Sequence, residues 1–140
     1  MNLRIMTGDL FEICDKEGGF PVHCISADKA MGAGIAVPMS KKYNLRTALR
    51  NKKLNVGDCV FVNGVFNLVT KEKYYEKPTI FTLNQALDNL VNICKEQNIK
   101  KICMPKIGCG LDRLCWDVVS KSINEKFEPL DIEIIEVYKE

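Results

Sequence analysis

The chain has 140 residues, of which 46% are hydrophobic and 27% charged, and its formal net charge is +2. This length fits one domain covering residues 1–140, with enough chain to bury a core, and the composition is that of a globular protein. The nearly balanced charge argues against a general nucleic-acid-binding domain. No apolar run is long enough to cross a bilayer, and the N-terminal segment lacks the apolar stretch of a signal peptide.

The first half of the chain predicts short strands and helices. Residues 3–7 read as a strand that ends at Gly8-Asp9, and residues 21–25 read as a second strand after the Gly18-Gly19 break. Helical segments follow at 34–43, with Pro38 in the first turn or two, and at 45–52. Asn63-Gly64 is a strong hairpin signal between strands at 58–62 and 65–70.

The second half alternates helices and strands. Residues 82–98 carry a helical apolar stripe, 100–105 form a buried strand, 115–127 carry a second helical stripe, and 131–138 close the chain as a strand. We therefore expect an α/β domain with a mixed sheet of about six strands, flanked by three or four helices. Ligands in such sheets bind beyond the carboxyl ends of the strands, so the loops that follow strands are the informative segments.

Two of the four loops that follow strands are rich in glycine. These are residues 25–36 and 105–113, whereas the other two cover 7–11 and 70–75. Glycine lets backbone amides approach a ligand, and a helix N-terminus favours anions, so two such loops can hold a diphosphate between them. Either loop alone is explained as well by a tight turn. The dinucleotide-binding pattern GxGxxG is absent.

Taken together, these loops resemble those of macrodomains, the ADP-ribose-binding fold. The matching stretches are GDLF at 8–11, HCIS at 23–26, MGAGIA at 31–36, TK at 70–71, KPT at 77–79 and MPKIGCGLDRL at 104–114, followed by Trp116. The chain is most similar to the branch that contains terminal ADP-ribose protein glycohydrolase and the bacterial antitoxin macrodomains that remove ADP-ribose from DNA. The resemblance covers nearly the whole chain.

The resemblance implies a set of ligand-binding residues. Asp9 is expected to accept a hydrogen bond from the adenine amino group, with Leu10 nearby. The two glycine loops and the strand residues beside them are expected to contact the diphosphate and the distal ribose. These contacts are assigned to Ile25, Gly32, Gly34, Ile35, Ala36, Ile107, Gly108, Cys109, Gly110 and Leu111.

Three side chains are implied in catalysis: Lys71, Asp112 and Ser26. By resemblance, the lysine attacks the anomeric carbon of the distal ribose and the aspartate helps to resolve the covalent intermediate. The residues alone also permit other interpretations. Lysines are usually solvated, Asp112 could cap a helix or pair with Arg113, and the Ser26 hydroxyl could have no role beyond a hydrogen bond to the backbone of its turn.

His23 and Cys109 are weaker candidates. A lone histidine more often packs or hydrogen-bonds than acts as a base, and Cys109 has no histidine beside it in the sequence. At residue 72, related sequences often have a basic residue, whereas this chain has a glutamate. Its carboxylate would favour the charged form of Lys71 unless it points away. Residues 25–34 also lack the asparagine on which many other macrodomains rely, so that mechanism does not transfer.

The predicted function is that of an ADP-ribosyl hydrolase that removes mono-ADP-ribose from acidic protein side chains or DNA. It could also deacylate O-acetyl-ADP-ribose. The alternative is a non-catalytic module that reads ADP-ribose; Lys71 and Asp112 together favour the enzyme. The number of cysteines, seven, is odd, and no two of them form a CxxC pair, so we expect neither disulfides nor a metal site. We also expect a cytoplasmic location. We also expect no cofactor, no membrane partner and a monomer.

Overall fold

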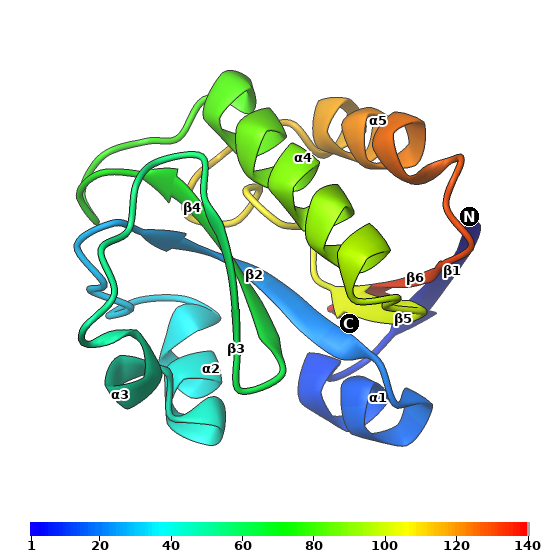
Figure 1. The fold of residues 1–140 in the computed structure, drawn as a ribbon, viewed down its shortest axis with the longest axis horizontal. Helices are drawn as coiled ribbons and strands as arrows, with labels where there is room; N and C mark the ends of the chain where they lie inside the picture. The colour runs from blue at the N-terminus through cyan, green and yellow to red at the C-terminus, as the bar shows by residue number, and fades with distance from the viewer. Residues whose placement is uncertain (140) are drawn as a thin grey trace.

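The computed structural model describes residues 1–139, which form a six-stranded sheet with helices on both faces (Figure 1). The elements follow in the order β1 (Asn2–Thr7), α1 (Leu10–Glu17), β2 (Phe20–Ser26), α2 (Ala36–Tyr43), α3 (Leu45–Leu49), β3 (Cys59–Val62), β4 (Val65–Lys71), α4 (Ile80–Glu96), β5 (Lys101–Met104), α5 (Trp116–Phe127) and β6 (Glu133–Tyr138). The expected α/β class and the six strands are confirmed.

The strands lie in the order β1-β6-β5-β2-β4-β3. The pairs β1–β6, β6–β5, β5–β2 and β2–β4 are parallel, and the β3–β4 hairpin is antiparallel, which makes the sheet mixed as predicted. Since five strands run in one direction, their carboxyl ends meet at a single edge of the sheet. The loops after β1, β2, β4 and β5 therefore start from that edge.

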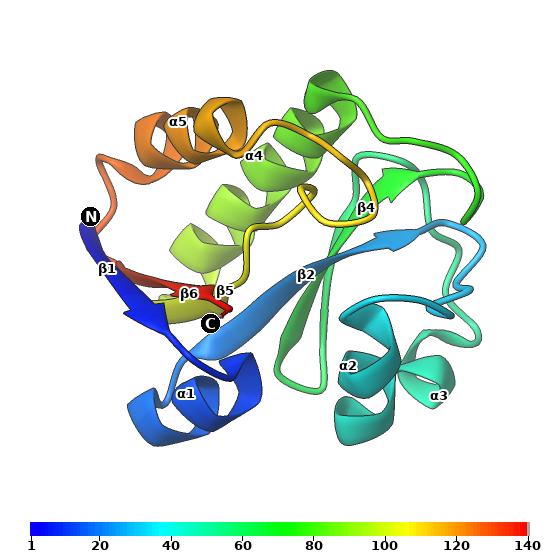
Figure 2. The same ribbon diagram turned by 180° about the vertical axis from the view of Figure 1, so that it is seen from behind.

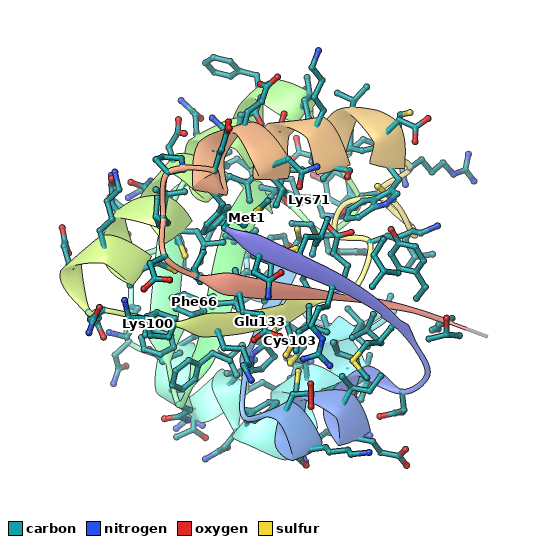
Figure 3. All side chains as sticks on the ribbon, turned by 90° about the vertical axis from the view of Figure 1, so that its right-hand side faces the viewer. Met1, Phe66, Lys71, Lys100, Cys103 and Glu133 are labelled. Atoms are coloured by element: carbon teal, nitrogen blue, oxygen red, sulfur yellow. The ribbon has the colours of Figure 1, made fainter. Side chains whose placement is uncertain are left out.

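The sheet separates two apolar clusters. Helices α4 and α5 cover one face, and α1, α2 and α3 cover the other (Figures 1 and 2). Strand β4 shows the alternation that produces this: Phe66 and Leu68 pack with α4, whereas Val65 and Val69 pack with the α2–α3 side. Cys103, labelled in Figure 3, packs with the residues of α1 on the second of these faces.

The sequence interpretation missed helix α1, so the described chain has five helices rather than three or four. The helix has only eight residues, and its apolar contacts come from Leu10, Ile13 and Cys14. The sequence nevertheless contained a signal for each end of this helix. Asp9 caps the N-terminus by accepting a hydrogen bond from the Glu12 amide, and Gly18 ends it in the left-handed conformation with φ of 76°.

The other predicted elements are found, with ends that differ by a few residues. Pro38 is the third residue of α2, where a missing amide hydrogen is tolerated, and Asn63-Gly64 forms the hairpin turn as expected. No helix within residues 1–139 combines the length and the apolar character that a bilayer crossing requires.

Candidate functional site

Three loops converge at the carboxyl edge of the sheet, beside the ends of β2 and β4 (Figure 2). The Lys77 ammonium, between β4 and α4, donates a hydrogen bond to the carbonyl oxygen of Leu111 at 2.7 Å. Leu111 also approaches the first glycine loop, because its Cδ1 would lie 3.4 Å from a Cβ added to Gly34. The loops at 27–35, 72–79 and 105–115 thus lie together at this edge of the sheet.

Lys71 and Asp112 form an ion pair at the centre of this site. The Lys71 Nζ lies 2.6 Å from Asp112 Oδ1, and the two side chains are only 15% and 16% exposed. Lysine ends β4, and the aspartate comes from the loop that follows β5. The pair favoured by the resemblance is therefore in direct contact. The carboxylate that pairs with Lys71 is that of Asp112, and the residue after Lys71 in the chain, Glu72, is exposed.

A register shift turns Lys71 toward Asp112. Ile25 pairs with Val69, but the next residue, Ser26, pairs with Lys71, so β4 contains one extra residue at Thr70. Without the shift, Lys71 would face the α1–α3 side with Val69. Bulges commonly redirect a side chain next to a functional site, and here the redirected group is the amine. No pattern in the sequence marks this irregularity.

Asp28 organises the loops around the ion pair, and the sequence interpretation missed it. Its Oδ1 accepts hydrogen bonds from the Ser26 hydroxyl at 2.5 Å and the Ala30 amide at 3.1 Å, and its Oδ2 accepts from the Tyr74 amide at 2.9 Å. Partial burial alone would raise the pKa of Asp28, but these hydrogen bonds outweigh it and hold the pKa below the ordinary value. The only feature of the sequence that could have identified Asp28 was its position two residues after the end of a strand.

Ser26 lies beside Lys71 in the sheet and is 4% exposed. Its hydroxyl donates to the side-chain carboxylate of Asp28, whereas the structural interpretation expected a bond to the backbone of the turn. A catalytic role for Ser26 stays a prediction.

The glycines of the two loops fall into two kinds. Gly34 and Gly108 have φ of 61° and 74°, so the backbone there requires glycine whether or not a ligand binds. For Gly110, an added Cβ would meet no heavy atom within 4 Å, and for Gly32 only the Ala30 oxygen at 3.9 Å. Neither of these two has positive φ. The tight-turn interpretation thus accounts for one glycine of each loop. At the other glycine the structure shows open space, and close approach of a ligand there stays a prediction.

The predicted adenine-side residues lie after β1, at the same edge of the sheet. Asp9 uses Oδ1 to cap α1, with the Glu12 amide 3.0 Å away, and the residue is exposed. Leu10 is 6% exposed and belongs to the core under the loop. The preceding Gly8 amide donates to the Tyr138 carbonyl, which fixes Asp9 next to the end of β6.

The remaining predicted contact residues differ in exposure. Ile25, Ala36 and Ile107 are at most 9% exposed and support the loops from within the core, whereas Leu111 is 63% exposed. Ile35 is half-buried and stands at the N-cap of α2. These positions are compatible with backbone contacts from the loops and side-chain contact from Leu111.

The alternative nucleophiles are poorly suited to that role. Burial raises the pKa of the Cys109 thiol, and its Sγ lies 3.3 Å from the Ile107 carbonyl oxygen. Cys24 lies near Asp112, and burial raises its pKa to about 12. Since the thiolate is the reactive form of cysteine, neither group is activated. Within residues 1–139, no group of three or more His, Cys, Asp or Glu side chains is arranged to hold a metal ion.

His23 is buried in the sheet and is not suited to proton transfer. It is 0% exposed, and its Nε2 lies 2.6 Å from Asn67 Oδ1 on the neighbouring strand. Burial lowers the pKa of His23 to about 4, so the ring is neutral near pH 7.

Comparison with known proteins identifies similar sequences and folds. The sequence model of the Macro domain family matches residues 30–123. Human ADP-ribose glycohydrolase OARD1 is 40% identical over 136 residues, covering 94% of this chain and 88% of the relative. The DNA ADP-ribosyl glycohydrolase of Mycobacterium tuberculosis is 22% identical over 143 residues, covering 92% of this chain and 40% of the relative.

Among solved structures, the macrodomain of Mycobacterium tuberculosis DarG is similar to the described fold. Its TM-score is 0.82 at 21% identity, and the match covers 96% of this chain and 97% of that chain. At 21% identity, this similarity shows a shared fold alone.

Proposed function

The chain belongs to the macro domain family, and from this premise we infer that it is an ADP-ribosyl hydrolase. The observation that carries the inference is the ion pair of Lys71 and Asp112, 2.6 Å apart and mostly buried, between two glycine loops. The names of the human and mycobacterial relatives, both glycohydrolases, support the same activity. A module that only binds ADP-ribose has no need of a desolvated lysine–carboxylate pair.

In the proposed mechanism, Lys71 first gives up a proton. An ammonium has no lone pair, and Asp112 Oδ1, at 2.6 Å, is the acceptor in reach. The free amine then attacks the anomeric carbon of the distal ribose. A bond forms between Nζ and this carbon while the bond from the carbon to the acceptor group breaks. For an acyl ester, the acceptor leaves as a carboxylate that keeps the bonding electrons. The proton that Asp112 took from Lys71 passes to this leaving group, which restores the Asp112 carboxylate.

The covalent intermediate is then hydrolysed. The Asp112 carboxylate accepts a proton from water as the water oxygen bonds to the anomeric carbon. The bond between the carbon and Nζ breaks, and its electrons return to the amine, which regains a proton. The products are ADP-ribose and the free acceptor. No cofactor enters this sequence of steps.

The acceptor is proposed to be an acidic side chain of a protein or a DNA base, and O-acetyl-ADP-ribose is a further candidate. A panel assay tests this by measuring release of ADP-ribose from glutamate-linked protein, from ADP-ribosylated DNA and from the acetyl ester. We expect turnover of at least one of these. Saturable binding of ADP-ribose with no turnover of any of the three would favour the alternative, a reader module.

Gly110 gives a test of the diphosphate cradle that is independent of folding. Gly110→Val places a Cβ where no heavy atom outside the adjacent residues lies within 4 Å, and φ at this position is not positive, so the free energy of unfolding should change little. The same side chain would occupy the space proposed for phosphate or ribose, and the Kd for ADP-ribose should rise about tenfold or more, which is 1.4 kcal/mol. Calorimetry and thermal unfolding measure the two effects.

Gly34→Val is the matched comparison. Its φ of 61° is unfavourable for valine, so this variant should lose stability as well as binding. If Gly110→Val binds ADP-ribose as the unchanged protein does, the second loop does not cradle the diphosphate.

Asp28 is proposed as a positioning residue. Asp28→Ala removes the acceptor of three hydrogen bonds and frees the loop after Lys71 at Tyr74, while the backbone bonds from the Ala27 and Asp28 amides to the Lys71 and Glu72 carbonyls remain. We expect kcat to fall by about 10- to 100-fold, because small displacements of reacting groups slow chemistry strongly. Asp28→Asn keeps one acceptor oxygen for Ser26 and Ala30 and should recover part of the lost kcat. A kcat within twofold of the original for Asp28→Ala would exclude this role.

A further inference from the structure

The positive charge of the chain is concentrated in one segment. Residues 29–57 contain seven of the twenty basic residues and none of the eighteen acidic ones. The remainder therefore carries thirteen basic and eighteen acidic residues, a formal charge of −5 against +7 for the segment. The total of +2 hides this separation, and the composition alone gave no reason to expect a basic surface.

These charges lie on one side of the molecule, on α2, α3 and the residues after them. We call this surface the α2–α3 face; its cations are Lys29, Lys41, Lys42, Arg46, Arg50, Lys52 and Lys53. All are exposed except the half-buried Lys29. Of these seven cations, Lys42 alone has a carboxylate partner within 4.0 Å among the described residues, which is Asp15 at 3.0 Å. The face is therefore positively charged and largely uncompensated.

The α2–α3 face continues into the proposed active site. Arg46 donates hydrogen bonds to the carbonyl oxygens of Ala30 and Met31, at the start of the first glycine loop. Lys41, Arg46 and Gly32 line one depression of about 350 Å³ between this loop and α2. An anionic chain bound along the face would therefore reach the loop that is proposed to hold the diphosphate.

Two exposed tyrosines lie on the other side of the same loop. Tyr74 and Tyr75 are 65% and 69% exposed, and their rings are 5.4 Å apart in an edge-to-face arrangement. The Tyr74 amide donates to Asp28, the residue before Lys29. Aromatic rings at the end of a cationic track are the combination that binds single-stranded nucleic acid, through stacking on bases and contacts to phosphates.

The same surface is poorly suited to a membrane. None of the large exposed hydrophobic residues among the described residues lies in 29–57, so the face has nothing to insert between lipids. An acidic protein would satisfy the charges but would leave the two tyrosine rings without a stacking partner.

We propose that the α2–α3 face binds the phosphate backbone of single-stranded nucleic acid and that Tyr74 and Tyr75 stack on its bases. The surface goes beyond the proposed function. The further step, that the acceptor of ADP-ribose is a nucleotide on this strand, rests on the proposed function.

The test measures fluorescence anisotropy of a labelled 12-nucleotide single-stranded DNA without ADP-ribose. We expect saturable binding that weakens as salt rises. Arg50→Gln/Lys52→Gln/Lys53→Gln should lower the slope of log K against log salt by about two, since each phosphate contact contributes about 0.7. Its affinity at low salt should fall about tenfold. Tyr74→Ala/Tyr75→Ala should weaken binding with little change in slope.

The matched control is Lys95→Gln/Lys100→Gln/Lys121→Gln, which removes three exposed charges outside the α2–α3 face and should leave most of the binding. Any of three results would overturn the proposal. The first is an equal loss of DNA affinity in the two triple variants, and the second is no DNA binding at low salt. The third is an affinity for a polyglutamate peptide or phosphatidylserine vesicles that equals the affinity for the DNA.

Hydrolysis of a mono-ADP-ribosylated peptide is measured in parallel and should be unchanged in Arg50→Gln/Lys52→Gln/Lys53→Gln. Absence of hydrolysis of every substrate, with DNA binding intact, would overturn the proposed function and leave the binding surface standing.

Discussion

Replacing Lys71 with alanine is expected to abolish release of ADP-ribose, lowering kcat by about 10³-fold or more, as expected when a nucleophile is removed. Binding of ADP-ribose should change little, because it is assigned mainly to backbone amides of the two glycine loops and to Asp9. The result is measured by single-turnover release of ADP-ribose and by calorimetry. Near-normal turnover would remove Lys71 as the nucleophile and leave a water activated by Asp112 as the candidate.

Lys71→Arg separates nucleophilic attack from the loss of the ion pair. Alanine leaves the mostly buried Asp112 carboxylate without its partner, which destabilises the site for reasons unrelated to chemistry. Arginine can keep a positive charge against Asp112, but its guanidinium is always protonated and does not attack carbon. We expect Lys71→Arg to fold and bind ADP-ribose and to be as inactive as Lys71→Ala.

Replacing Asp112 is expected to give the second-largest effect. Asp112→Asn keeps the size of the side chain and an oxygen facing Lys71, but it cannot accept a proton. We expect kcat to fall by about 10²- to 10⁴-fold, the range that a general acid–base group contributes. The first attack should be less impaired than hydrolysis of the intermediate, because the Lys71 ammonium can also lose its proton to bulk water before it attacks, whereas hydrolysis requires a base fixed beside the intermediate.

Asp117→Asn is the matched control for this substitution. Asp117 is an exposed carboxylate in the first turn of α5, five residues from Asp112. Its replacement changes the net charge in the same way, so it should leave kcat within about twofold. Equal effects of the two substitutions would assign the loss to the local field rather than to proton transfer.

The sequence predicted the strands and the longer helices because their patterns are periodic over many residues. The stripe of Leu83, Leu87 and Leu90 locates α4, and Asn63-Gly64 locates the hairpin. Helix α1 was missed because it has only eight residues, so its apolar stripe repeats over too few turns to stand out in the sequence. The caps at Asp9 and Gly18 were the better signal for this short helix.

The contents of the site were predictable only in part. Residue types and family resemblance identified Lys71 and Asp112, but the contact between them depends on the extra residue at Thr70, and local sequence does not reveal such a shift in pairing. Asp28 was missed for a related reason. Its partners Ser26 and Ala30 are local, but Tyr74 is 46 residues away and comes near only when β2 pairs with β4.

The most direct test of the central claim is intact-protein mass spectrometry of Asp112→Ala mixed with a mono-ADP-ribosylated substrate. The claim predicts a protein species with the added mass of an ADP-ribosyl group, which is ADP-ribose less one water, and peptide mapping should assign that mass to Lys71. The double variant Lys71→Arg/Asp112→Ala should show no added mass. An adduct at another residue, or slow turnover by Asp112→Ala with no adduct at any time after mixing, would contradict covalent catalysis by Lys71.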